Sequence, residues 1–172
     1  AWEYVSTGHP VLGVSSIAFA PGDSSVMYIG TGEVYSYDDT QGGIAVRLTR
    51  GSFGIGVLKS TDGGATWSKS LDWSYQQQRG VWVVRVDPLD PDVVWAGTTV
   101  GTYKSLDAGA TWTQVDDTIM VNDLAIHPAN PDTVIIACGN LGSVGHGLYR
   151  TTDGGLNWTK LNVAAASAPS FE

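Results

Sequence analysis

Residues 101–112 read Gly-Thr-Tyr-Lys-Ser-Leu-Asp-Ala-Gly-Ala-Thr-Trp, and two close copies of this stretch stand at 56–67 and 147–158. The aspartates of the three copies, Asp62, Asp107 and Asp153, are 45 and 46 residues apart. That period is the size of one four-stranded blade of a β-propeller. The repeat therefore predicts an array of blades.

A weaker motif precedes each copy. An alternating or apolar segment ends at a turn that holds Pro21, Pro88 or Pro128, and a short β-branched segment follows. Proline fixes φ for a turn and stops the preceding strand, so each motif predicts two strands joined by a turn. With the strands on either side of the aspartate turn, each repeat has four. In the second repeat we expect them at 83–86, 93–96, 102–105 and 112–115. The predicted class is all-β, with antiparallel four-stranded blades.

The blades are expected at 14–70, which includes an inserted loop at 33–54, and at 81–115 and 121–163. Residues 1–13 resemble the end of a preceding blade, and 164–172 resemble a connection into a next one. Three units are too few to close a propeller ring, and open strand edges favour aggregation. We therefore expect further blades, from the same or another chain, as partners.

The aspartate turn follows the pattern Ser/Thr-x-Asp-x-Gly-x-Thr/Asn-Trp. Aspartate accepts hydrogen bonds from following backbone N–H groups, glycine adopts positive φ, and the first hydroxyl adds a local bond. The tryptophan starts the next strand and covers the turn with its ring. One aspartate per repeat in a hairpin favours a structural role over a catalytic or metal-binding one. The residues given this structural role are Ser60, Asp62, Gly64, Trp67, Ser105, Asp107, Gly109, Trp112, Thr151, Asp153, Gly155 and Trp158.

These turns resemble the Asp-box, or BNR repeat, of sialidases, sortilin-type (Vps10) propellers, xyloglucanase-like glycoside hydrolases and photosystem-assembly propellers. Over about residues 14–160 the chain looks most similar to bacterial sortilin-like secreted proteins. The resemblance implies a propeller that is secreted, at the cell surface or periplasmic. It does not choose an activity, because the family hosts several.

Composition excludes some partners. The formal net charge is −8, from 17 acidic and 9 basic residues without a basic run, which disfavours nucleic acid and anionic membrane surfaces. No apolar run approaches the roughly 20 residues of a membrane-spanning helix. Cys138 is the single cysteine, so an internal disulfide is impossible, and its apolar surroundings predict a buried structural thiol.

Successive strands of a blade alternate in direction, so the Asp-box turns mark one end of the molecule and the longer connections lie at the other. Long loops on one rim of a regular scaffold are the usual place for binding. Aromatic rings beside carboxylates and amides suit sugar or peptide ligands. The ligand-binding candidates on this rim are Glu33, Tyr35, Tyr37, Arg47, Trp73, Tyr75, Arg79 and His146.

A glycosidase needs two placed carboxylates, and Glu33, Asp38 and Asp39 are weak catalytic candidates by position. No catalytic motif accompanies them, so the sequence favours a non-catalytic extracellular module for glycan or protein recognition or assembly scaffolding. The alternative is part of a polysaccharide-active glycoside hydrolase, xyloglucanase-like or sialidase-like. We expect no cofactor and no metal site. A calcium loop formed by Asp38 and Asp39, followed by Gly42 and Gly43, is the alternative there.

Overall fold

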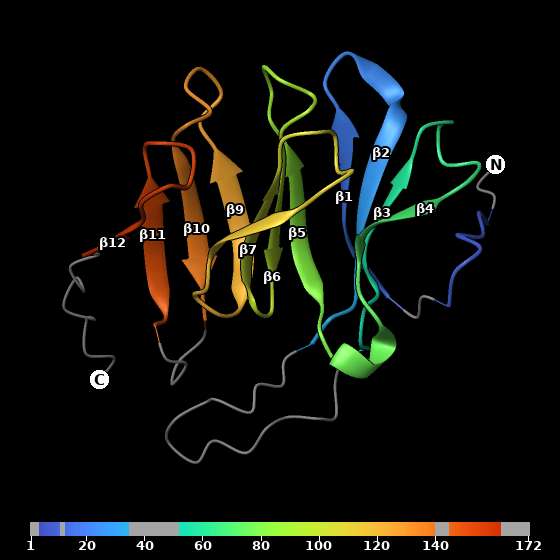
Figure 1. Ribbon diagram of the computed structural model, residues 1–172, viewed down its shortest axis with the longest axis horizontal. Helices are drawn as coiled ribbons and strands as arrows, with labels where there is room; N and C mark the ends of the chain where they lie inside the picture. The colour runs from blue at the N-terminus through green and yellow to red at the C-terminus, as the bar shows by residue number, and fades with distance from the viewer. Residues whose placement is uncertain (1–3, 11–12, 35–51, 140–144, 163–172) are drawn as a thin grey trace, which may run out of the picture.

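The computed structural model describes residues 4–10, 13–34, 52–139 and 145–162, and these are nearly all β. Three antiparallel sheets of four strands follow one another along the chain, and Figure 1 shows them side by side. The predicted all-β class and four-stranded blades are confirmed. Blade 1 consists of β1 (Val14–Ala20), β2 (Asp23–Thr31), β3 (Gly56–Ser60) and β4 (Ser68–Asp72). Blade 2 consists of β5 (Val81–Val86), β6 (Val94–Thr98), β7 (Gly101–Ser105) and β8 (Thr113–Asp116). Blade 3 consists of β9 (Val121–Ile126), β10 (Val134–Cys138), β11 (Gly147–Thr151) and β12 (Thr159–Leu161).

The predicted strands of blade 2 agree with the structure to within two residues. One detail was wrong: β8 begins at Thr113, so Trp112 ends the turn and does not start the strand. The indole of Trp112 donates from Nε1 to Ser70 Oγ of blade 1 at 3.0 Å. This tryptophan therefore joins its turn to the neighbouring blade.

The local hydrogen bonds expected of the aspartate turns are present in all three copies. In the second, Ser105 Oγ accepts from Gly109 N at 2.8 Å and donates to Asp107 Oδ1 at 2.7 Å. Asp107 also accepts from the backbone N–H and the hydroxyl of Thr111, at 2.8 and 2.6 Å. Gly109 has φ +80°, a left-handed conformation that glycine adopts without strain.

In the third copy Asn157 replaces the threonine, and its side-chain amide donates to Asp153 Oδ2 at 2.8 Å. The bonds from the side chain and backbone of this fourth residue after the aspartate lower the pKa of Asp62, Asp107 and Asp153 to about 2. The replacement therefore preserves the hydrogen bonding of the turn.

In blades 2 and 3, the proline turn at the same end is held by the side chain just before the proline. Asp87 Oδ1 accepts from Leu89 N at 2.8 Å and Asp90 N at 3.2 Å. His127 Nδ1 makes the corresponding bonds in blade 3, to the backbone N–H groups of residues 129 and 130. His127 is thus a turn residue.

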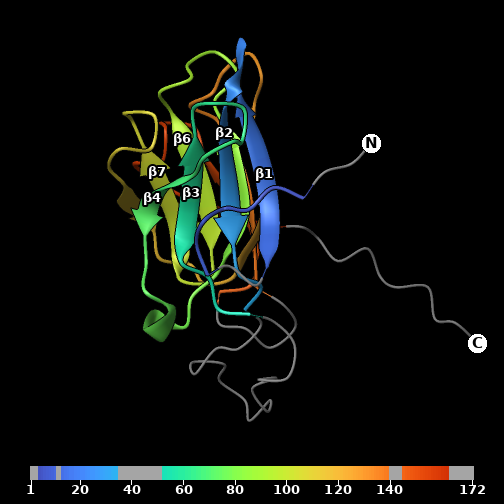
Figure 2. The ribbon, with the colours of Figure 1, turned by 90° about the vertical axis from the view of Figure 1, so that its right-hand side faces the viewer.

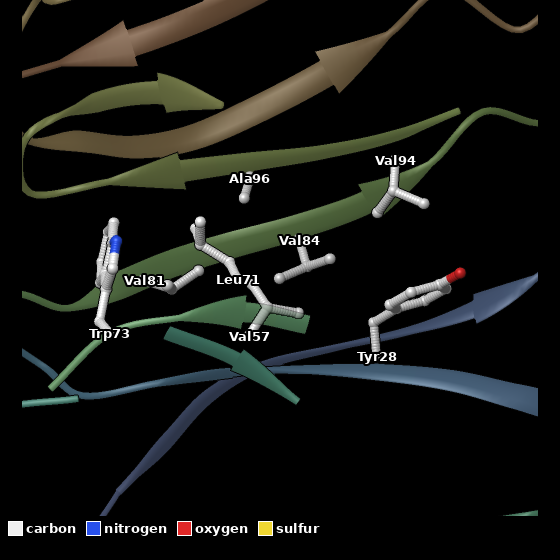
Figure 3. Close-up of a cluster of buried hydrophobic side chains, with 8 residues drawn as sticks. All are labelled: Tyr28, Val57, Leu71, Trp73, Val81, Val84, Val94 and Ala96. Atoms are coloured by element: carbon white, nitrogen blue, oxygen red, sulfur yellow. The ribbon is translucent and has the colours of Figure 1, made fainter. Parts of the chain in front are cut away.

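Two buried clusters join the blades. Between blades 1 and 2, valines of β5 pack against Tyr28, Leu71 and Trp73 of blade 1 (Figure 3). Between blades 2 and 3, Trp95 packs with Val121, Leu124 and Ile136. Cys138 belongs to this second cluster and is only 5% exposed, so its predicted burial is confirmed, and burial raises the pKa of its thiol to about 12. These two clusters lie between the blades, and a third, formed by Ile29, Ile55 and Leu58 with Trp67, lies on the face of blade 1 turned away from blade 2.

The connections separate to two ends as predicted. The β1–β2, β5–β6 and β9–β10 turns lie at one end, while the short 3₁₀ helix η1 (Tyr75–Gln77) lies at the other (Figures 1 and 2). The described part of the chain contains no helix long and apolar enough to cross a membrane.

Candidate ligand-binding rim

The end opposite the Asp-boxes carries the described parts of the long connections: residues 32–34, 52–55, 73–80, 99–100, 117–120, 139 and 145–146. We call this set the long-loop rim. Backbone hydrogen bonds cross it from blade to blade. The N–H of Thr99 donates to Gly80 O at 3.0 Å, Met120 N to Thr99 O at 3.2 Å and Gly139 N to Met120 O at 2.8 Å. On the blade 1 side, Gly54 N donates to Arg79 O at 2.7 Å. The rim is thus a continuous platform, since each connection is tied to the next.

Trp73 is part of the core of this platform. It is only 5% exposed, and its ring meets that of Tyr103 edge to face at 5.7 Å. The guanidinium of Arg79 lies over the ring at 5.5 Å. We therefore leave Trp73 out of the ligand contacts that we propose, because a neighbouring blade and Arg79 already occupy its faces.

Tyr75 is the exposed aromatic among the predicted binding residues that the structure describes. It is 45% exposed at the start of η1, and its ring meets Phe53 edge to face at 5.4 Å. A capping arrangement fixes η1, because the amide oxygen of Gln77 accepts from Ser74 N at 2.8 Å. Gln78 then ends the helix with φ +54°. An exposed tyrosine, packed against a half-buried phenylalanine, therefore stands on an ordered turn.

Glu33 follows β2 and is exposed, with its backbone N–H bonded to Ser52 O at 2.9 Å. His146 is also exposed, ahead of β11. The other predicted residues, Tyr35, Tyr37, Asp38, Asp39 and Arg47, lie outside the described residues, as do Trp2 and 164–172. The structure thus brings Tyr75 and Arg79 together on one connection but does not test the full predicted set or the calcium loop.

Asp116 is a titratable rim residue that the sequence analysis missed. It ends β8 half-buried, and burial raises the pKa of its carboxyl even though Thr118 N donates to it at 3.0 Å. The nearby charge of Asp117 acts in the same direction. The Asp-Asp pair just before a new blade was its visible signal. Within the described ranges, no cluster of three or more potential metal ligands occurs.

The chain is similar to one known protein family. The family Sortilin-Vps10, described as sortilin and neurotensin receptor 3, matches residues 56–171. No curated protein matches the chain.

Solved structures give the same fold. The GH74 xyloglucanase from Xanthomonas campestris superposes with a TM-score of 0.62 at 17% identity, covering 92% of this chain and 25% of that one. The GH74 enzyme of Niastella koreensis gives 0.57 at 20% identity, covering 88% and 23%. YCF48 bound to D1 peptide gives 0.50 at 17% identity, covering 88% and 42%. At these identities the likeness shows the fold alone, and this chain spans less than half the length of each.

Proposed function

The chain belongs to the Sortilin-Vps10 family as part of a β-propeller, and from that premise we propose that it is a non-catalytic module that recognises a protein ligand on the long-loop rim. We propose further that it acts outside the cell, at the surface or secreted, as the family resemblance implies. The observation that carries the proposal is the exposed ring of Tyr75, packed edge to face against the half-buried Phe53 on a hydrogen-bonded platform.

The arrangement of rings favours protein over glycan. A sugar-binding platform presents a broad ring face, and the largest ring of the described rim, Trp73, is buried under Arg79. Tyr75 instead offers an edge-packed ring with a hydroxyl beside three glutamines, 76–78. Such amphipathic aromatics, bordered by amides, are common anchors in protein recognition. YCF48, which has the same fold, is known in complex with a D1 peptide.

The negative charge of the chain favours ligands of positive charge. The net charge of the whole chain is −8, and Glu33 and Asp117 are exposed on the rim. A field of this sign attracts cationic partners and raises their rate of association. We therefore propose a ligand segment of positive charge, whose binding weakens as salt rises.

Selection from a displayed library of random peptides tests this function. Peptides selected on the immobilised chain should be enriched in Lys or Arg. Their affinity should fall about tenfold for Tyr75→Ala, since such an anchor contributes on the order of 1–2 kcal/mol. Leu106→Ala is the matched control, because Leu106 is an exposed apolar residue of the Asp-box end. The control should bind as the unchanged chain does.

Assays of hydrolysis and binding on a panel of polysaccharides, including xyloglucan, distinguish the recognition proposal from the glycoside hydrolase alternative. Hydrolysis by the chain that is abolished by Glu33→Gln would replace the recognition proposal with a glycoside hydrolase. Binding to glycans, with no enrichment of peptides, would make the ligand a sugar.

A further inference from the structure

The two blade-to-blade interfaces repeat one pair of side chains on the earlier blade. Tyr28 of β2 pairs across the sheet with Lys59 of β3, and Trp95 of β6 pairs with Lys104 of β7. Each lysine Nζ lies near the ring of its partner, at 5.6 and 4.7 Å from the ring centre. A ring and a cation in register thus mark the face on which the next blade rests.

Each lysine binds the Asp-box of the following blade. Lys59 Nζ donates to Ala108 O at 2.7 Å, and Lys104 Nζ donates to Gly154 O at 2.8 Å. Both acceptors are the residue directly after the Asp-box aspartate, so the two contacts are equivalent. The Asp-box turn is therefore both a local turn and the docking element between blades.

Blade 3 carries the corresponding pair, Ile135 and Arg150, in the same register. Ile135 is 37% exposed and Arg150 is exposed, whereas Tyr28 and Trp95 are fully buried. Leu148 on the same strand as Arg150 corresponds to Val57, which is fully buried in blade 1. We call the side chains Ile135, Ala137, Leu148 and Arg150 the open face of blade 3.

Blade 1 presents the complementary face at its inner strand only, because Ile29 and Leu58 on the same face are already buried with Ile55 and Trp67. Val14 and Ile17 of β1 are 51% and 53% exposed, while the residues in the same register of β5, Val81 and Val84, are buried against blade 1. The corresponding residues of β9 are buried against blade 2. Gly63 of blade 1 stands where Ala108 and Gly154 stand in the later boxes. An open face and its counterpart thus continue the interfaces already formed.

A further position, besides Ile135 and Arg150, distinguishes the open face from the two covered ones. Blades 1 and 2 have glycine there, and a Cβ on Gly30 would lie 2.9 Å from Val81 Cγ1 of the next blade. A Cβ on Gly97 would lie 2.7 Å from Val121 Cγ1. Blade 3 has Ala137 at this position. A valine at the start of the next inner strand would therefore overlap the Cβ of Ala137 in the arrangement of blades 1 and 2, and one of them would have to shift at a cost in packing energy.

We propose that the open face of blade 3 docks a further Asp-box blade whose inner strand begins with glycine or alanine, and that Ala137 rejects a second copy of this chain. Arg150 donates to the carbonyl after the aspartate of that blade, as the two lysines do within the chain. In a second copy of this chain, Val14 would stand at the start of the inner strand, and its Cγ atoms would overlap the Cβ of Ala137. The inference rests on the interfaces between blades and is independent of the ligand rim.

Sedimentation velocity on the chain and its variants tests the proposal. The unchanged chain should not associate through these faces. Ala137→Gly should produce head-to-tail association, because it removes the overlap with Val14. Val14→Ala should do the same from the other side, so the test survives if one variant fails to fold. Ala129→Gly, in a turn at the Asp-box end, is the matched control and should leave the chain as it was.

Adding Arg150→Met to either associating variant should weaken association about tenfold, the usual loss for a charge-assisted hydrogen bond that is partly exposed to solvent. Association of the unchanged chain as tight as that of the variants would show that Ala137 selects nothing. The proposal would also be overturned if both variants folded but did not associate. It would be overturned as well if Arg150→Met left their association unchanged.

Discussion

The interface between blades 1 and 2 is polar around its lysine, whereas apolar and aromatic side chains surround the lysine of the interface between blades 2 and 3. In the first, the hydroxyl of Tyr28 joins Lys59 at Ala108 O, at 2.9 Å, and Ser70 Oγ donates to Gly109 O at 2.6 Å. Burial raises the pKa of Tyr28 to about 12, and the charge of Asp92 adds to this, so the phenol remains a donor.

In the second interface, rings replace these hydrogen bonds. Trp95 meets Trp158 edge to face at 6.3 Å, and Val115 stands where blade 1 has Ser70. The buried Nε1 atoms of both tryptophans make no hydrogen bond to the described residues. The lysine-to-carbonyl contact is the same in both. The repeat therefore preserves the hydrogen bond from the lysine to the backbone carbonyl, while the side chains that pack around it differ between the two interfaces.

The largest loss of stability is expected from a substitution in the interface between blades 2 and 3. Trp95→Ala should lower the free energy of unfolding by about 3–5 kcal/mol, because it empties a fully buried ring site. Tyr28→Phe, the matched change in the polar interface, removes one hydroxyl and should cost about 1 kcal/mol. Urea unfolding measures both. Equal losses would contradict the distinction between the interfaces.

The shared contact is tested by Lys59→Met and Lys104→Met. Each removes a charge-assisted hydrogen bond while keeping the apolar stem, and each should cost about 1 kcal/mol after allowance for partial exposure. Losses that differ by more than a factor of two, by the same urea titration, would show that the contact is not equivalent in the two interfaces. Lys69→Met, at an exposed surface ion pair with Asp72, should change stability by less than about 0.5 kcal/mol.

We expect the substitution Ala108→Gly to stabilise the protein. This residue has φ +53°, while the equivalent Gly63 and Gly154 have φ +69°. Ala108→Gly removes the strain of a left-handed alanine and should raise the free energy of unfolding by about 0.5–1 kcal/mol. The carbonyl that accepts from Lys59 is kept. Ala110→Gly in the same turn is the control, and a gain there of the same size would refute the strain argument.

The smallest expected effect is common to all three blades and depends on pH. The folded-state pKa of each Asp-box carboxyl, about 2, lies below its ordinary value of 3.8. The stabilisation is therefore present above pH 3.8 and is lost as the pH falls through about 2. Unfolding measured from pH 5 to pH 2 should show declining stability. Asp107→Asn should flatten the decline, and an unchanged slope would contradict the assignment.

The sequence predicted the blades because the information is local. The aspartate, glycine and hydroxyl of each box lie within a few residues, so their spacing alone implies the turn. The burial of Trp73 could not be predicted from its own segment, because Tyr103, which meets its ring, comes from the next blade. Asp116 was missed because the largest influence on the pKa of its carboxyl is burial, which only the packing of the blades creates.

The sequence by itself determined the repeat, the strand order and the end of the molecule at which each turn lies. The cations Lys59, Lys104 and Arg150, three residues before each aspartate, were equally visible in it. The tertiary structure alone decided that these lysines bind the next blade's turn, 49 and 50 residues away. Such contacts depend on how two sheets pack face to face, and a pattern within one repeat carries no record of that packing.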